Sequence, residues 1–199
     1  MMRTRPASVH PAMRIAAIGS VCAIALLAFP FPVRASPAVD SDVTVHVAKE
    51  KAAFSISVEF TVSATALEAW NVLTDYEHMA QIVSNIDSSE VMSRDGNRIE
   101  VAQRSHGHAG PIRISVDGVR VVDLSPYTEI HSHLKKGDLK ASDFTTRITD
   151  EGEVTRVTAH GTIVAAAWVA WAISPAAIEA QTRRQYQELR DEILRRKAR

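Results

Sequence analysis

The chain has 199 residues, of which 46% are hydrophobic, and its 23 basic side chains balance 23 acidic ones. A nucleic-acid-binding surface is marked by a strongly basic face, so this composition argues against a nucleic-acid partner. The single cysteine, Cys22, lies in the N-terminal segment, which leaves the rest of the chain without disulfide or thiol chemistry.

Residues 1–35 have the pattern of a secretory signal peptide. Three arginines precede an unbroken run of apolar and small residues over 15–29, and Val33 and Ala35 occupy the −3 and −1 positions of a cleavage site. A run of 15 residues is shorter than the roughly 20 that span a bilayer, which favours cleavage near Ala35 over a retained membrane anchor and leaves both alternatives open. We therefore predict a periplasmic or secreted protein. Without residues 1–35, which contain four arginines and no acidic residue, the chain has 19 basic and 23 acidic residues and a net charge of −4.

A polar segment, 36–51, is expected to be flexible, and regular elements follow it. Thr65 and Glu68 have the spacing of a capping box, which predicts a helix that ends near Thr74. A second short helix is expected over 77–83. Before these helices, apolar side chains recur at every second position and predict a strand with one buried face: Phe54, Ile56, Val58, Phe60 and Val62.

The pattern then changes to antiparallel strands separated by turn signals. Asp95-Gly96-Asn97 is typical of a hairpin turn, and Asp117-Gly118 interrupts the alternation of a later strand, which predicts a β-bulge there. Ser174 and Pro175 are suited to start the last and longest helix. The six expected strands cover 89–93, 98–105, 112–124, 127–134, 140–149 and 153–164. The stripe of the last helix that should face the sheet contains Ile178, Thr182, Tyr186, Leu189 and Ile193.

Together with four short stretches, these elements resemble the START-like (SRPBCC) superfamily, in its polyketide cyclase/dehydrase and coenzyme Q-binding branch. The stretches are AWNVLTDY at 69–76, VMSRDGN at 91–97, Gly137-Asp138 and TRVT at 155–158. The resemblance implies an α+β helix-grip domain over 52–197. Its seven-stranded antiparallel sheet would curl around a long C-terminal helix, with two short helices after the first strand. Members bind hydrophobic small molecules, and the superfamily has no shared catalytic motif.

In such a fold the apolar phase of each strand faces a cavity. Polar side chains within that phase, such as Gln103 and Ser132, are typical of a ligand pocket, although a polar group satisfied by backbone or water follows the same pattern. The inward phase of the strands contains no titratable residue, so we assign no catalytic residue. The expected ligand cavity is lined by Trp70, Tyr76, Ile99, Val101, Gln103, Ser105, Ser132, Phe144, Thr146, Ile148, Trp168, Trp171, Tyr186 and Leu189.

The segment 163–173 is uniformly apolar and too short to span a membrane, so it is expected to be a strand end that runs into the last helix. If it turns helical, Trp168 and Trp171 become neighbours that guard the cavity mouth or touch a membrane surface, because tryptophan tolerates an interface.

His131 and His133 share one face of a strand, and imidazoles suit zinc or copper. Their phase opposes that of Ile130 and Leu134, however, which predicts that they face solvent, and no motif supplies further ligands. We therefore expect no metal and no cofactor. Asp75 is interpreted as a helix cap rather than a general base.

Three functional hypotheses follow. The first is an exported carrier or sensor of a hydrophobic small molecule, such as a lipid, a quinone or a polycyclic compound. The second is an enzyme of the cyclase, dehydrase or aromatase type that uses the same cavity. The third is a periplasmic protein-interaction module with a closed core. The sequence favours the first and does not identify the ligand or the oligomeric state.

Overall fold

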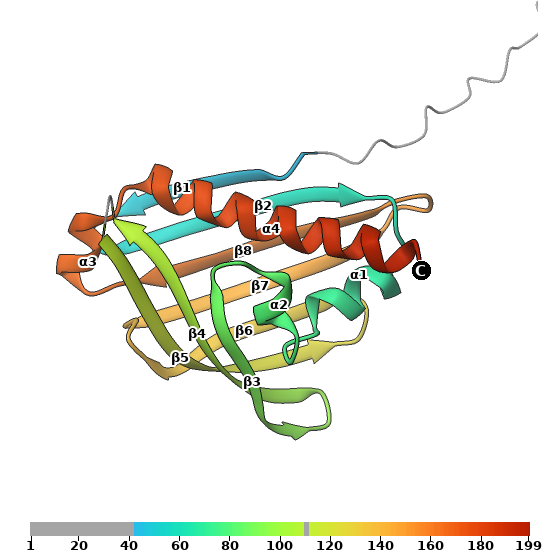
Figure 1. Cartoon of the computed structure of the whole chain (residues 1–199), viewed down its shortest axis with the longest axis horizontal. Helices are drawn as coiled ribbons and strands as arrows, with labels where there is room; N and C mark the ends of the chain where they lie inside the picture. Colours follow the sequence, from blue (N-terminus) through green and yellow to red (C-terminus); the bar gives the residue numbers. More distant parts are fainter. Residues whose placement is uncertain (1–41, 110–111) are drawn as a thin grey trace, which may run out of the picture. The chain divides into compact units, whose positions relative to one another are not determined.

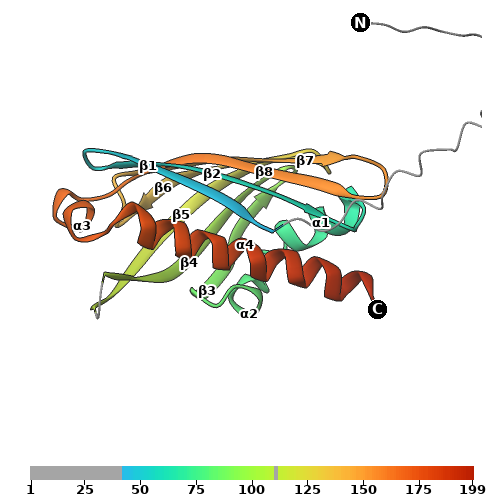
Figure 2. The ribbon, with the colours of Figure 1, turned by 90° about the horizontal axis from the view of Figure 1, so that it is seen from above.

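The computed structural model describes residues 42–109 and 112–199, so the predicted signal peptide lies outside the described part of the chain. An eight-stranded antiparallel sheet, ordered β1-β2-β8-β7-β6-β5-β4-β3, is crossed on one face by the long helix α4 (Figures 1 and 2). This is the α+β helix-grip arrangement expected from the sequence. None of the helices in the described residues has the length and apolar character needed to cross a membrane.

The elements follow one another along the chain with short connections. They are β1 (Thr44–Glu50), β2 (Ala53–Val62), α1 (Ala66–Leu73), α2 (Met79–Ile82), β3 (Ile86–Asp95), β4 (Arg98–Ala109), β5 (Ile112–Ser125), β6 (Glu129–Gly137), β7 (Ala141–Asp150), β8 (Thr155–Val164), α3 (Ala167–Ala172) and α4 (Pro175–Lys197).

The sheet has one strand more than the seven predicted, because part of the segment that we expected to be flexible forms β1. This strand pairs with β2 from Thr44↔Glu59 to Glu50↔Ala53. Val43 and Val45 are buried, and Val47 packs against the core. The alternation of these three valines is a strand signal that the polar character of the segment obscured.

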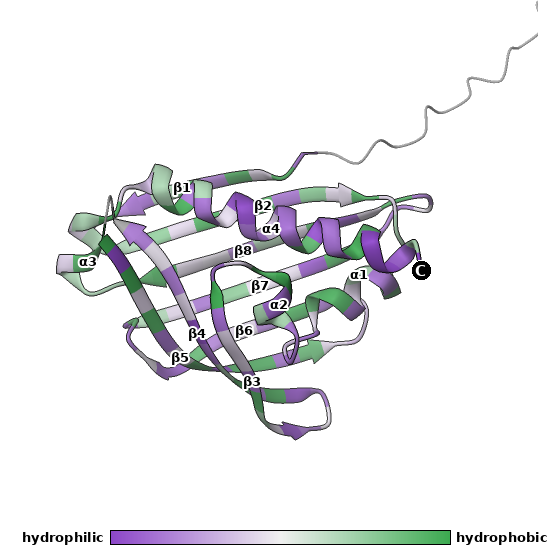
Figure 3. Ribbon diagram, in the orientation of Figure 1, coloured by the Kyte–Doolittle hydropathy of each residue, from purple (hydrophilic) through white to green (hydrophobic). Residues whose placement is uncertain are grey.

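The strand β2 and the helix α1 confirm the change of period in the sequence. Every second side chain of β2 is buried, and Figure 3 shows alternating hydropathy along several strands. Thr65 Oγ1 accepts a hydrogen bond from the Glu68 backbone N–H at 3.2 Å, and Glu68 Oε2 accepts one from the Thr65 N–H at 2.8 Å. The capping box therefore forms as predicted and fixes the start of α1.

The second helix is shorter than expected, and Asp75 is not its cap. The residue at the N-cap of α2 is His78. The Asp75 carboxylate instead contacts His78 Nδ1 at 2.7 Å and accepts a hydrogen bond from Arg196 Nη2 at 2.7 Å. Partial burial raises the pKa of Asp75, but these two bonds outweigh it and hold the pKa below its ordinary value. Asp75 thus ties the α1–α2 connection to the end of α4.

The predicted bulge at Asp117-Gly118 is wrong for the pairing of β4 with β5, whose register runs without a shift. The irregularity lies on the other side, where Val119 pairs with Lys136 and Arg120 with Leu134, so β6 contains the extra residue. Since β5 keeps its alternation through Gly118, Arg120 lies on the same face as Val122, which is fully buried.

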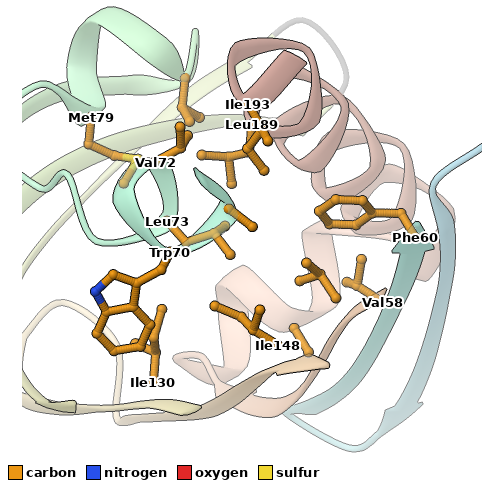
Figure 4. Close-up of a cluster of buried hydrophobic side chains, with 14 of the residues drawn as sticks. Val58, Phe60, Trp70, Val72, Leu73, Met79, Ile130, Ile148, Leu189 and Ile193 are labelled. Carbon is orange, nitrogen blue, oxygen red and sulfur yellow. The ribbon is translucent and has the colours of Figure 1, made fainter. Parts of the chain in front are cut away.

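The last helix begins as predicted, with Ser174 Oγ accepting a hydrogen bond from the Ala177 N–H at 3.2 Å and Pro175 at the first position. Toward its C-terminal end, Leu189 and Ile193 are buried against β2 and α1. Figure 4 shows these side chains pointing toward one another with Phe60 and Val72. The hydrophobic core is therefore solid beneath this end of the helix.

Candidate functional site

A cavity of about 400 Å³ lies between the sheet and the N-terminal part of α4. The α1–α2 connection and α3 contribute to its other sides. Most of the wall is apolar, and the residues that form it include Phe54, Ile56, Tyr76, Met79, Asn85, Gln103, Ser105, Ile114, Val116, Arg120, Ile130, Ser132, Leu134, Ser142, Phe144, Thr146, Ile163, Val169, Ile173, Ile178, Thr182, Tyr186 and Leu189.

The structure places eight of the fourteen predicted residues along this cavity. They come from the α1–α2 connection, the inward faces of β4, β6 and β7, and α4: Tyr76, Gln103, Ser105, Ser132, Phe144, Thr146, Tyr186 and Leu189. The assignment of the inward strand faces thus agrees with the structure, because Ile130 and Leu134 also face the cavity while His131 and His133 do not line it.

Four of the remaining predicted residues belong to the solid core rather than to the cavity wall: Trp70, Ile99, Val101 and Ile148. They lie further along the same elements, where helix and sheet are in direct contact. The indole of Trp70 packs edge-on against the ring of Tyr127, with centroids 5.7 Å apart. Trp70 therefore stabilises the closed end of the domain.

The last two predicted residues, Trp168 and Trp171, do not line the cavity either. The apolar segment does turn helical, as α3, but the two indoles are 69% and 88% exposed. The other side of the segment faces inward, with Ala170 buried and Val169 and Ile173 on the cavity wall. A uniformly apolar sequence has no phase from which its inward side can be derived.

The helix α3 is held in place by β1. The Lys49 ammonium group donates a hydrogen bond to the backbone carbonyl of Ala170 at 2.5 Å and one to that of Ile173 at 3.4 Å. Cations are favourable at these positions because the last carbonyls of a helix lack partners within it. The additional strand β1 therefore carries the contact that fixes one side of the cavity.

Arg120 is a charged residue of the cavity that the sequence did not predict. Its Nη2 donates to Ser142 Oγ at 2.5 Å, and its Nε is buried without a hydrogen-bond partner. Within 42–109 and 112–199, no carboxylate hydrogen bonds to this guanidinium. Burial lowers the pKa of Arg120, but a guanidinium stays charged in proteins. The cavity therefore contains a cation that lacks a directly bonded counter-charge.

The phenol groups of Tyr76 and Tyr186 lie close enough to Arg120 for its positive charge to affect their pKa values. Burial raises the pKa of Tyr76 and of Tyr186, and the positive charge of Arg120 only partly offsets this effect. Both hydroxyls thus remain protonated around neutral pH and can donate hydrogen bonds. The neighbouring Thr146 side chain also lowers the pKa of Tyr186 in part. Tyr76 and Tyr186 are both partly exposed, because their side chains line the cavity.

A second polar group lies at the β3–β4 side of the cavity wall. His106 Nδ1 is 2.9 Å from Asp87 Oδ1, and Arg113 Nη2 donates to the same oxygen at 2.7 Å. Asn85 Oδ1, also on the wall, is buried without a hydrogen-bond partner. The contact with Asp87 fixes the orientation of the His106 imidazole at this side of the cavity. The cavity thus contains titratable groups that the predicted inward phase lacked.

Phe144, which provides a large apolar surface in the cavity, depends on a glycine of the neighbouring strand. Gly161 on β8 pairs directly with Phe144 on β7. A Cβ atom at position 161 would overlap the Phe144 ring. The ring therefore lies over the backbone of β8, where only glycine leaves space for it.

Comparison with known families matches residues 53–193 to the family model described as polyketide cyclase / dehydrase and lipid transport. This confirms the resemblance to the START-like superfamily. The match covers the sheet from β2 onward and almost the whole of α4, and thus all the elements that surround the cavity. Among curated proteins, none matches the chain.

Solved structures with the same fold are distant in sequence. TTHA0849 from Thermus thermophilus has a TM-score of 0.62 and 16% identity, over 70% of this chain and 97% of that one. The Zhui aromatase/cyclase from Streptomyces sp. R1128 has a TM-score of 0.60 and 17% identity, over 72% of this chain and 95% of that one. A STAR-related lipid transfer protein fragment from Xanthomonas axonopodis has a TM-score of 0.59 and 14% identity, over 79% of this chain and 97% of that one. At these identities the likeness concerns the fold.

Proposed function

The chain belongs to the polyketide cyclase / dehydrase and lipid transport family, and on that premise we propose that it binds and carries a hydrophobic small molecule. The observation that carries the proposal is the Arg120 guanidinium, to which no carboxylate of the described residues hydrogen bonds, in an otherwise largely apolar cavity of about 400 Å³. Cavities from about 300 to 1,000 Å³ with few polar groups are typical of small-molecule sites. The third hypothesis requires a filled core, so the cavity favours the carrier over it.

The polar groups define the chemistry of the cargo. A buried charge is costly unless a partner of opposite charge or a hydrogen-bonding group accompanies it. A carboxylate, phosphate or carbonyl oxygen of the cargo would accept hydrogen bonds from Arg120 and from the phenol of Tyr76, while the hydrocarbon part packs against Phe144. We therefore propose an amphipathic ligand, such as a lipid or a quinone, with its oxygen-bearing end at Arg120.

The area available is sufficient for useful affinity. Removing about 400 Å² of apolar surface from water at about 25 cal/mol per Å² contributes about 10 kcal/mol. Association costs several kcal/mol in lost freedom, and the hydrogen bonds at Arg120 add to what remains. Micromolar binding, which corresponds to about 8 kcal/mol, is therefore within reach.

We further propose that the protein is exported and meets its cargo at a membrane surface. Exposed tryptophans are favourable in the interfacial region of a bilayer, and Trp168 and Trp171 lie on the helix whose other side closes the cavity. Sedimentation with phosphatidylcholine vesicles should decrease when both are changed to alanine. Equal sedimentation of the two proteins contradicts this contact.

Intact-mass measurement of protein from an exporting host tests cleavage after Ala35.

An enzyme of the cyclase or dehydrase type is the second candidate, because of the groups that the structure adds to the cavity. Arg120 and the two phenols can polarise a carbonyl oxygen, and His106, held by Asp87, can accept a proton from an adjacent carbon. Turnover of a poly-β-keto thioester that is lost in both His106→Gln and Arg120→Met would favour catalysis over transport.

The decisive experiment is native mass spectrometry of the full chain purified from its own host, followed by solvent extraction and identification of the bound compound. We expect one amphipathic molecule per chain in wild type and reduced occupancy in Arg120→Met. A ligand without oxygen, or equal occupancy in both proteins, would contradict the role of Arg120. A protein that binds no compound under any condition would overturn the carrier hypothesis.

A further inference from the structure

A group of three metal-ligating side chains lies on the face of the sheet opposite to the cavity. Asp123, His131 and His133 each offer one donor atom, and these atoms lie within 4.8 Å of one another. All three side chains are half-buried. The sequence identified the two histidines but no third ligand, because Asp123 precedes them in a different strand and only the register of the sheet brings it alongside.

The register of β5 and β6 explains the grouping. Asp123 is directly paired with His131, and directly paired residues of antiparallel strands point to the same face. His133 is two residues further along β6 and therefore shares this face. The imidazole rings of the two histidines are 5.6 Å apart with an interplanar angle of 34°. The residues between and beside them, Ser132 and Ile130, point into the cavity instead.

The surrounding charges also suit a cation. The Asp143 carboxylate on β7 lies 3.2 Å from His131 Nε2 with both of its oxygens. A carboxylate that accepts the remaining N–H of a ligating imidazole orients the ring and makes it more basic. On the other side, Arg98 Nη1 is 3.6 Å from Asp123 Oδ1, at an exposed position. An exposed ion pair of this kind contributes little, so a bound cation can replace it.

We propose that Asp123, His131 and His133 form a binding site for a divalent transition-metal ion, with Zn²⁺ as the representative occupant. Tetrahedral ligands of zinc at about 2.1 Å lie about 3.4 Å from one another, so donor atoms that lie within 4.8 Å need to approach by at most about 1.4 Å. Two imidazoles and one carboxylate suit zinc, copper and nickel, whereas Mg²⁺ and Ca²⁺ prefer sites built from oxygen ligands alone. Three protein ligands leave a coordination position for water.

The consequence for the fold is a cross-link between β5 and β6. The site lies two residues from the extra residue of β6, Lys135, where the two strands change register. It also joins the strands that carry Arg120 and Ser132 on the inner face. Because a metal that binds only the folded state stabilises it, Zn²⁺ should raise the midpoint of thermal unfolding in proportion to the logarithm of its concentration.

The test is equilibrium dialysis of the metal-free full chain against Zn²⁺, with Mg²⁺ as the comparison ion. We expect binding of Zn²⁺ but not Mg²⁺, and an affinity at least about tenfold lower in His133→Gln and in Asp123→Asn. The matched control is His160→Gln, since His160 is also on the outer face but bonds Ser57 through Nδ1 at 3.1 Å. That variant should bind Zn²⁺ like wild type.

Equal Zn²⁺ affinity in wild type, His133→Gln and Asp123→Asn would overturn the proposal, as would the lack of any binding to wild type at millimolar Zn²⁺. Electron paramagnetic resonance of the Cu²⁺-loaded wild type provides a readout that needs no variant. Two equivalent imidazole nitrogens in the copper coordination sphere support the site, whereas oxygen ligands alone contradict it.

Discussion

The two ends of the space beneath α4 differ in how they are filled. Near the C-terminal end, Ile193 is completely buried and packs with Phe60 and Val72 in a solid core. Near the N-terminal end, Ile178 and Thr182 belong to the same stripe of the helix but border the cavity. The stripe is continuous, so the difference arises from the partners opposite it.

At the closed end, helix α1 brings large side chains between the sheet and α4. At the open end, small polar side chains of the sheet, among them Ser132 and Thr146, line the cavity instead. A helix stripe therefore predicts which side chains turn inward, but not whether they meet a partner. Stability resides at the closed end and binding at the open end, and mutations can test this division.

The largest expected effect is on stability, from Ile193→Ala. Truncating this fully buried side chain should lower the free energy of unfolding by about 2–5 kcal/mol, because it removes buried methyl groups and leaves a void. Ile178→Ala at the open end is the matched control, and it should cost less than half as much because space already exists beside it. Urea denaturation measures both. Equal losses would contradict the division into two ends.

The second prediction places a charge in the open end. Phe144→Arg should lower ligand occupancy about a hundredfold, since it puts an unpaired cation near Arg120 and removes an apolar wall. Replacing His131 and His133 together by glutamine should leave occupancy nearly unchanged, because both lie on the outer face. Native mass spectrometry quantifies occupancy. If the histidine pair abolished binding while Phe144→Arg had no effect, the two faces of the sheet would be inverted.

The third prediction concerns the polar end of the cavity. Arg120→Met should weaken binding of an anionic amphiphile, such as a fatty acid, about tenfold or more, and should leave binding of the matching alcohol less affected. Stability should stay constant or increase, because a buried cation that no carboxylate of the described residues hydrogen bonds is removed. Arg120→Lys keeps the charge but not the planar donors and should be intermediate. Calorimetric titration with both ligands measures these affinities. If Arg120 only supported the cavity wall, the affinities for the acid and for the alcohol would fall equally.

The smallest effect is expected at the closed end, from the link between Asp75 and Arg196. The pKa of Asp75 is lowered in the folded protein, so the stabilisation is present above the ordinary aspartate pKa of about 3.9 and is lost as pH falls further. Asp75→Asn should cost about 1 kcal/mol at pH 7 and less below pH 4. Thermal unfolding of wild type and Asp75→Asn between pH 3 and 7 measures this difference. If the stability of the two proteins changed in parallel with pH, the role given to the Asp75 carboxylate would be contradicted.

The fold was predictable because its signals are local. The change of period between β2 and α1, the cap at Thr65 and the start of α4 at Ser174 each depend on a few neighbouring residues, and all are confirmed. The position of Arg120 was not predictable in this way. The turn-like Asp117-Gly118 suggested a bulge in β5, while the actual register change lies in β6. A strict alternation through β5 is the signal that would have placed Arg120 inward.

The pairing of Gly161 with Phe144 has a consequence for which molecules the protein admits. A side chain larger than glycine at position 161 has to displace the aromatic ring, and the open side of that ring is the cavity. The size limit of the cargo is thus set partly from behind the wall, by a residue that does not line the cavity. Related chains can therefore differ in selectivity while every side chain that touches the ligand stays the same.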